Sequence, residues 1–344
     1  MLTGQLTVDL GAIAANWRAL DAMTAPRCET AAVVKADAYG CGIGAVGPAL
    51  RQAGADCFFV ATPTEGAALR RALGSGPRIH ILAGYTADER PHFEAHALRP
   101  VLNAPGQVAA WMAGPAGPAM LQLDTGMNRL GLEPAELAAL GPLPEIITHV
   151  ISHLACADAP EHPQNRAQRQ AFTEMTAGCP LPLSLAATGG VLLGSDFHFA
   201  LTRPGIGLYG GLPFAEARPV VTLEIPILQV REISPGEAVG YGATWVATRP
   251  SRIATIAAGY ADGLIRAMGG EARGFLQGQP VPFAGRVSMD LISLDVTDTG
   301  AEPGQMIELL GPCQSVDDLA RAASTIGYEI LTSLGPRYAR NYRP

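Results

Sequence analysis

The first two-thirds of the chain alternates short apolar segments with helical windows, and this alternation limits the choice of fold. Strands are expected at residues 31–34, 57–61, 78–82, 99–102, 120–124, 148–153, 183–187 and 197–202. Helices are expected between them at residues 44–53, 63–73, 107–113, 134–140 and 164–177. Alternation of this kind indicates parallel pairing, in a closed barrel or an open doubly wound sheet. The strand number and a length of about 220 residues favour an α/β fold with a (β/α)8 TIM-type barrel.

The pattern changes after about residue 220, where strands follow one another without helices between them. These strands are expected at residues 222–230, 253–258, 281–284, 291–296 and 306–310, with helices at 316–324 and 328–334 near the end. We therefore predict two domains. Residues 1–222 form the barrel, and residues 223–344 form a mainly β domain.

Composition narrows the class of protein. The formal net charge is −7 and the basic residues are scattered, whereas a nucleic-acid-binding surface needs clustered positive charge. None of the six cysteines forms a C-x-x-C pair, so no zinc or redox motif is present. We see neither a signal peptide nor an apolar run of about 18 residues. We expect a cytoplasmic protein that uses no metal and binds neither nucleic acid nor membrane.

Lys35 follows the apolar segment 31–34 and is itself followed by a glycine-rich stretch. The residues leave two interpretations open. One is a solvated lysine at a strand end, and the other is a Schiff-base lysine whose amine is partly desolvated. Tyr39 lies four residues further on and could reach a phosphate oxygen. Residues 40–44 do not fit a dinucleotide-binding loop, because no acidic residue ends a strand about 20 residues later.

The seventh and eighth expected strands are both followed by glycine-rich loops, Thr188–Gly190 and the RPGIGLYG segment of residues 203–210. In barrels, the corresponding loops often bind phosphate through backbone amides. Ordinary turns are the alternative. His153 at the end of the sixth strand is either a core residue or part of the site. Several unusual residues fall at carboxyl ends of strands, where barrel active sites lie: Lys35, Arg129, His153, Thr188 and Arg203.

Seven segments together resemble the alanine racemase family of pyridoxal-phosphate (PLP) enzymes. They are VVKADAYG (33–40), LDTGMNRLG (123–131), ISHLACAD (151–158), RPGIGLYG (203–210), VGYGATW (239–245), AAGYADG (257–263) and GRVSMD (285–290). They occur in the family's order and run through both expected domains. The resemblance implies a barrel followed by a β domain with which residues 1–10 pack. It also implies a homodimer in which the partner's β domain completes each active site.

The resemblance further implies roles for individual residues. Lys35 matches the lysine that holds PLP, and Tyr241 matches a tyrosine from the other subunit. Tyr241 then removes the α-proton of L-alanine, and Lys35 removes that of D-alanine. His153 matches a histidine beside this tyrosine. Arg203 matches an arginine on the pyridine nitrogen, where its permanent charge disfavours protonation of the ring.

Other matches concern the phosphate, the substrate and the entrance. The implied phosphate contacts are Tyr39, Gly189, Gly205 and Ile206; the substrate-carboxylate contacts are Arg129 and Met289; the entrance residues are Tyr260 and Asp290. Several positions depart from the family, and at two of them, Trp245 and Pro336, a tyrosine is frequent in other members. Gln122 stands where many members have a carbamylated lysine that positions the arginine. Gly189 stands where serine is frequent, so only its backbone could contribute.

The expected function is interconversion of L-alanine and D-alanine, which supplies D-alanine for peptidoglycan. A racemase acting on serine or on a broader set of small amino acids is an alternative. So are a PLP-dependent decarboxylase and a non-catalytic PLP-binding protein. The GYGATW segment argues against a decarboxylase, which needs no tyrosine base opposite the lysine. The second domain argues against a carrier.

Overall fold

The computed structural model describes residues 4–344 and divides them into two compact units. The barrel unit comprises Ile13–Leu208 and Pro213–Glu216. The β unit comprises the described residues up to Ala12, together with Tyr209–Leu212 and Ala217–Pro344.

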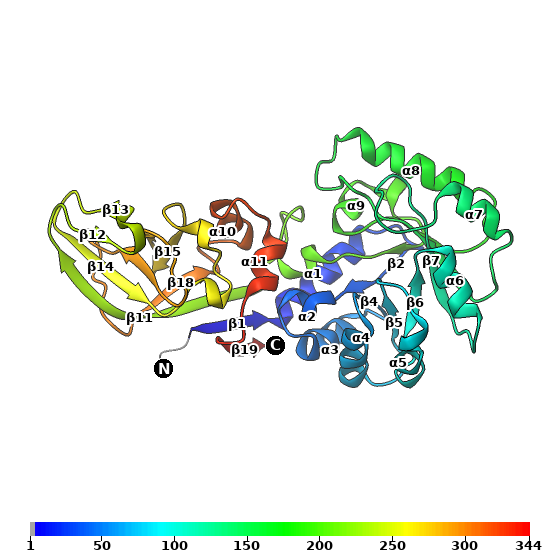
Figure 1. The fold of residues 1–344 in the computed structure, drawn as a ribbon, viewed down its shortest axis with the longest axis horizontal. Helices are drawn as coiled ribbons and strands as arrows, with labels where there is room; N and C mark the ends of the chain where they lie inside the picture. The colour runs from blue at the N-terminus through cyan, green and yellow to red at the C-terminus, as the bar shows by residue number, and fades with distance from the viewer. Residues whose placement is uncertain (1–3) are drawn as a thin grey trace. The chain divides into compact units, whose positions relative to one another are not determined.

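The barrel unit is built on a ring of parallel strands (Figure 1). Seven strands follow one another in the sheet: β3(Ala32–Val33), β4(Cys57–Val60), β5(Arg78–Ile81), β6(Arg99–Leu102), β7(Ala119–Gln122), β8(Ile147–Ile151) and β9(Leu183–Ser184). The ring closes through β10(Leu201–Thr202), which pairs with β2(Glu29–Thr30). Only Ala31 separates β2 from β3. On its other side, the backbone just after β10 is hydrogen-bonded to the backbone just after β9. The Arg203 amide donates to the Ala186 carbonyl at 2.8 Å. The predicted (β/α)8 barrel is confirmed.

Most helices of the barrel unit lie where the sequence predicts them. These are α3(Ile43–Ala53), α4(Pro63–Leu73), α6(Pro105–Met112), α7(Pro134–Leu140) and α8(Pro163–Met175). Four of them begin with proline, whose fixed φ suits the first helical turn. Three helices were not predicted from the sequence: α1(Leu10–Met23), α5(Arg90–Ala95) and α9(Thr188–Leu192). The segment labelled α2(Lys35–Tyr39) contains left-handed backbone and is a turn, not a regular helix. The strand expected at 197–202 is reduced to β10, because Phe199 adopts a positive φ of 53°.

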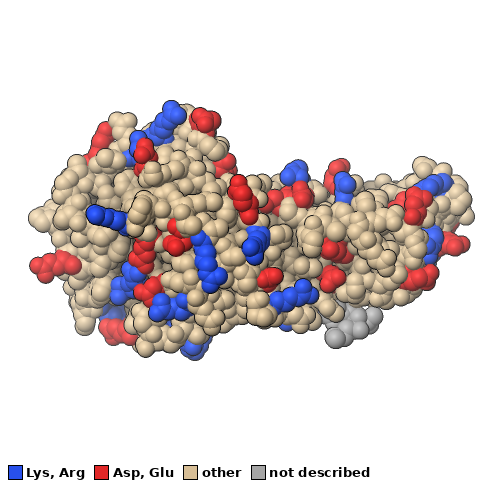
Figure 2. Space-filling view, turned by 180° about the vertical axis from the view of Figure 1, so that it is seen from behind, with Lys and Arg blue, Asp and Glu red and all other residues tan. Residues whose placement is uncertain are grey.

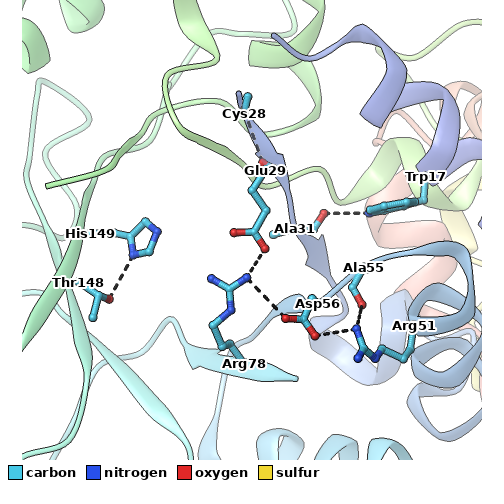
Figure 3. Close-up of polar contacts among 10 residues, drawn as sticks. All are labelled: Trp17, Cys28, Glu29, Ala31, Arg51, Ala55, Asp56, Arg78, Thr148 and His149. Carbon is cyan, nitrogen blue, oxygen red and sulfur yellow. Dashed lines mark hydrogen bonds and ion pairs between the residues drawn. The ribbon is translucent and has the colours of Figure 1, made fainter. Parts of the chain in front are cut away.

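Charged side chains gather near the amino-terminal ends of the barrel strands (Figure 3). Arg78 of β5 pairs with Glu29 of β2, and it lies 3.9 Å from Asp56. Asp56 in turn accepts a hydrogen bond from Arg51 of α3 at 2.6 Å. Ion pairs at this end of a barrel join different strands of the ring and serve stability, because barrel active sites lie at the opposite end.

The β unit has eight strands in its main sheet (Figure 1). They are β1(Gln5–Asp9), β11(Val221–Ile233), β14(Ser251–Ile256), β15(Arg273–Leu276), β16(Gln279–Pro282), β17(Ile292–Asp295), β18(Met306–Leu310) and β19(Ala339–Arg343). A small hairpin is formed by β12(Ala238–Val239) and β13(Trp245–Val246), and the helices are α10(Val316–Ala322) and α11(Gly327–Ser333). The mainly β character predicted for the second part of the chain is confirmed. Strands β12, β13, β15 and β19 were not predicted from the sequence.

Strand β11 organises this sheet because it pairs with three others. It pairs with β1, β18 and β14, and β1 in turn pairs in parallel with β19. The sequence predicts β11 to end at residue 230, whereas it continues to Ile233 opposite Ser251 of β14. Leu223, Ile225 and Ile227 are buried at alternate positions, which is the period of a strand with one face on a core.

Basic and acidic side chains are interspersed on the face in Figure 2. No helix in residues 4–344 combines the length and the hydropathy that crossing a membrane requires. Among the same residues, no cluster of three or more His, Cys, Asp or Glu side chains is arranged to hold a metal ion.

Candidate active site

Lys35 lies at the carboxyl end of β3, on the barrel rim where active sites are found. It is the only lysine in the sequence, a signal that the sequence analysis did not use. Burial lowers the pKa of the Lys35 amine, and the positive charge of Arg129 lowers it further, against the opposing effect of Glu65. A lysine with a lowered pKa is more often neutral, and the neutral amine is the nucleophile.

The turn that follows Lys35 has a left-handed backbone. Residues Ala36, Asp37, Ala38 and Tyr39 have φ angles of 53°, 54°, 55° and 54°. Each non-glycine residue in this conformation costs about 1–2 kcal/mol. Hydrogen bonds hold the turn: the Gly40 amide donates to the Ala36 carbonyl at 2.8 Å, and the Ile43 amide donates to the Asp37 carboxylate at 2.7 Å. Backbone strain that is held in this way is typical of functional sites.

The turn places Tyr39 against the glycine-rich loop after β10. A Cβ atom at Gly205 would lie 2.3 Å from the Tyr39 hydroxyl oxygen, so any side chain there would have to displace the Tyr39 hydroxyl. The Thr188 hydroxyl accepts hydrogen bonds from the amides of Gly205 at 3.0 Å and Gly207 at 3.3 Å. Two hydroxyls and backbone amides therefore meet where Ile206 begins a short 3₁₀ turn, η3(Ile206–Tyr209). This donor set fits a phosphate group.

Thr188 is a further candidate for the phosphate site. The family resemblance points instead to Gly189, and only to its backbone. A Cβ atom at Gly189 would lie 2.7 Å from the Ala157 carbonyl oxygen, so a serine would not fit at this position. The hydroxyl of this loop is supplied one residue earlier, by Thr188, whose side chain is buried.

Arg203 follows β10 and is buried. Its guanidinium donates to the Ser152 carbonyl at 2.6 Å and to the Ser184 hydroxyl, and it lies 6.0 Å from the centre of the Phe59 ring. Burial lowers the pKa of Arg203 to about 10. The side chain thus remains positively charged at neutral pH, and the partners named here are neutral groups.

His153 follows β8 and stands among the positive charges of the site. Burial lowers the pKa of His153 to about 3, with further contributions from the charges of Arg203, Arg129 and Lys35. The ring is therefore neutral at physiological pH. Lys35, Arg129, His153 and Arg203 all follow barrel strands, so their side chains belong to the same rim.

Arg129 ends a loop that is wrapped around the Asp124 carboxylate. Asp124 accepts hydrogen bonds from four amides, of which that of Arg129 lies at 3.1 Å. Burial opposes ionisation of Asp124, but these four bonds outweigh it and lower the pKa of the carboxyl. Gln122 donates to the Leu130 carbonyl at 3.1 Å and so supports the backbone next to Arg129.

The β unit carries the other predicted site residues. Tyr241 sits between Gly240 and Gly242, both with a φ of 75°, and the tyrosine is 73% exposed. Glycine is the residue that adopts such angles without strain. The turn therefore presents the Tyr241 ring outward from its own unit.

Tyr260, Met289 and Asp290 lie together in the β unit. The Tyr260 amide donates to the Ser288 carbonyl at 3.0 Å, and both Tyr260 and Met289 are exposed. The Arg337 guanidinium forms two ion pairs. One is with the Asp290 carboxylate at 2.8 Å, and the other is with the carboxylate of buried Asp262 at 2.6 Å. Within residues 4–344, the Met289 amide donates to no backbone carbonyl.

Comparison with known proteins places the chain in a family. Residues 8–213 match the family model for the alanine racemase N-terminal domain, and residues 220–342 match that for the C-terminal domain. An alanine racemase of Jannaschia sp. is 55% identical over 100% of both chains, and one of Cereibacter sphaeroides is 55% identical over 99% of both.

Solved structures of alanine racemases also match this chain over nearly its whole length. A Bartonella henselae alanine racemase with covalently bound pyridoxal phosphate matches with a TM-score of 0.93 and 39% identity over 99% of both chains. The biosynthetic alanine racemase of Pseudomonas aeruginosa matches with a TM-score of 0.94 and 38% identity over 100% of both chains. The family matches cover both units of the fold, and this chain belongs to the alanine racemase family.

Proposed function

We propose that this protein interconverts L-alanine and D-alanine, using PLP attached to Lys35. The observation that carries the proposal is the position of the only lysine, at a barrel rim beside the donor set of Tyr39, Thr188 and Gly205. When bound, PLP supplies an electron sink that acidifies the α-hydrogen of an amino acid. The chain itself must then hold the substrate and move one proton.

Racemisation needs proton-transfer groups on opposite faces of the α-carbon. We assign the Lys35 amine to one face, where it removes the proton of D-alanine, and the Tyr241 hydroxyl to the other, where it removes the proton of L-alanine. Return of a proton on the opposite face inverts the configuration. Tyr241 comes from the second subunit of a homodimer in this proposal, and its 73% exposure supports that arrangement. His153, with its neutral ring, is assigned to accept a hydrogen bond from the tyrosine hydroxyl.

Other side chains orient the reactants. Tyr39, Thr188 and the amides of Gly189, Gly205 and Ile206 are assigned to the phosphate. Arg203 is assigned to the pyridine nitrogen, where a lasting positive charge disfavours ring protonation and suppresses side reactions.

The remaining assignments concern the substrate. Arg129 and the Met289 amide hold its carboxylate, and Tyr260 and Asp290 line the entrance. We place the enzyme in the cytoplasm, where its product D-alanine enters peptidoglycan.

Proton NMR of L-alanine with the PLP-loaded protein in D₂O tests this function. We expect loss of the α-proton signal together with formation of D-alanine. Amine and carbon dioxide as products would instead indicate a decarboxylase. Exchange with serine and not with alanine would indicate a different substrate, and bound PLP without exchange of any amino acid would indicate a carrier.

Sedimentation velocity combined with activity tests the shared site. We expect the active species to be a dimer. An active monomer would refute the assignment of Tyr241 to the partner subunit.

A further inference from the structure

The carboxylate of Glu65 joins the carboxyl ends of two neighbouring barrel strands. One oxygen, Oε1, accepts the amide of Ala36 at 2.7 Å, directly after Lys35 and β3. The other, Oε2, accepts the amide of Ala61 at 2.8 Å, directly after β4, and that of Thr62 at 3.4 Å. A single side chain on α4 therefore sets the spacing between the Lys35 turn and the next strand.

Helix capping accounts for only part of this arrangement. Glu65 and Thr62 form a capping box at the start of α4, in which the Glu65 side chain needs to reach only the Thr62 amide. The bond to Ala36 reaches back 29 residues and adds nothing to the helix. Hydrogen bonds to a charged acceptor are stronger than those between neutral groups, so this bond can hold a strained segment.

That segment is the left-handed turn of residues 36–39. Ala36 is its first residue, with a φ of 53°, and Asp37 holds the far end through the Ile43 amide. An alanine side chain disfavours a positive φ and offers no local hydrogen bond that would compensate. Without Glu65, the Ala36 amide loses its carboxylate partner, and the turn can relax toward the right-handed region.

We propose that Glu65 is a positioning residue for attachment of the cofactor. By holding Ala36 in the left-handed conformation, its carboxylate sets where the Lys35 amine and the Tyr39 hydroxyl lie relative to each other. The inference rests on the proposed role of Lys35 in binding PLP. The negative charge of Glu65 has a second effect, because it opposes the lowering of the Lys35 pKa by burial and by Arg129.

The test compares E65A with T62A. Both variants remove one half of the capping box, so T62A is the control for lost helix stability. Only E65A also frees the amides of Ala36 and Ala61, and rescue by A36G separates these two effects. Hydrogen exchange of the apo protein is the first measurement. We expect residues 36–43 to exchange faster in E65A and to remain as in the wild type in T62A.

Affinity for PLP is the second measurement. We expect the dissociation constant to rise about tenfold or more in E65A, the effect of losing one hydrogen bond to a charged group, with little change in T62A. E65Q keeps one oxygen acceptor and should fall between E65A and the wild type. If E65A does not fold, the comparison is made with E65Q.

A rescue separates positioning from general damage. Glycine adopts positive φ at no steric cost, and Ala36 is exposed, so A36G should restore much of the PLP affinity in the E65A background. Equal behaviour of E65A and T62A, or no rescue by A36G, would overturn the inference.

Reduction with borohydride distinguishes this failure from failure of the proposed function. A wild-type protein that shows no PLP trapped on Lys35 refutes the function itself. A wild-type protein that traps PLP while E65A matches T62A refutes only the role of Glu65.

Discussion

Replacing Thr188 by valine removes a hydroxyl on which two backbone amides depend. In the structure the Thr188 hydroxyl accepts from Gly205 at 3.0 Å and from Gly207 at 3.3 Å, and all three residues are buried. Valine has nearly the same shape, so no cavity forms. Each buried N–H left without a partner costs about 1–3 kcal/mol. We expect the free energy of unfolding of the apo barrel unit to fall by at least about 2 kcal/mol.

Urea unfolding followed by tryptophan fluorescence measures this loss. The sequence has three tryptophans, and in a W245F background the remaining two, Trp17 and Trp111, both belong to the barrel unit. T188S keeps the hydroxyl and is the control. A T188V protein within about 0.5 kcal/mol of T188S would refute the reasoning, because it would mean that the amides find other partners at no cost.

Loading with PLP extends the same experiment. If the phosphate takes the Gly205 amide as proposed, it replaces the missing hydroxyl as the partner of that amide. The stability difference between T188V and T188S should then be smaller in the loaded protein than in the apo protein. An unchanged difference would place the phosphate elsewhere.

Three further predictions concern the proton-transfer residues and the barrel interior. K35A should trap no PLP on reduction with borohydride, as read by mass spectrometry, because the sequence contains no other lysine; a trapped adduct on a side chain would contradict the assignment. Y241F should still bind PLP but lose about 10²–10⁴-fold in turnover of L-alanine, the range for removal of a general acid–base group, and near-normal turnover would remove Tyr241 from the mechanism. Burial lowers the pKa of His149 to about 4, with help from Arg78 and Arg99, so the unfolded chain protonates first as the pH falls below about 6.5. The stabilising effect of neutral His149 is therefore present above about pH 6.5 and lost toward pH 4. In this window the free energy of unfolding from urea titrations should fall less steeply with decreasing pH in H149N than in the wild type, by the equivalent of about one bound proton. An unchanged slope would count against this assignment.

Local sequence signals account for the elements that were predicted with their observed bounds. Helices α4 and α7 were predicted with both bounds correct, because each begins with proline and carries a capping box. Strand β10 was predicted too long, since nothing local announces the positive φ of Phe199. The hairpin of β12 and β13 was missed because each strand has only two residues, too few for a periodic pattern.

For the site, the sequence by itself determined which residues are brought to one rim. Lys35, Arg129, His153 and Arg203 each follow a barrel strand, and parallel strands in a closed ring place their carboxyl ends on one face. Only the tertiary structure decided how these residues are held. The left-handed turn after Lys35, the hydrogen bonds from the Gly205 and Gly207 amides to the Thr188 hydroxyl, and the bond from the Ala36 amide to Glu65 all depend on contacts between segments far apart in the chain. Such contacts leave no local pattern, because alanine, aspartate and tyrosine favour right-handed or extended backbone until a distant partner overrides that preference.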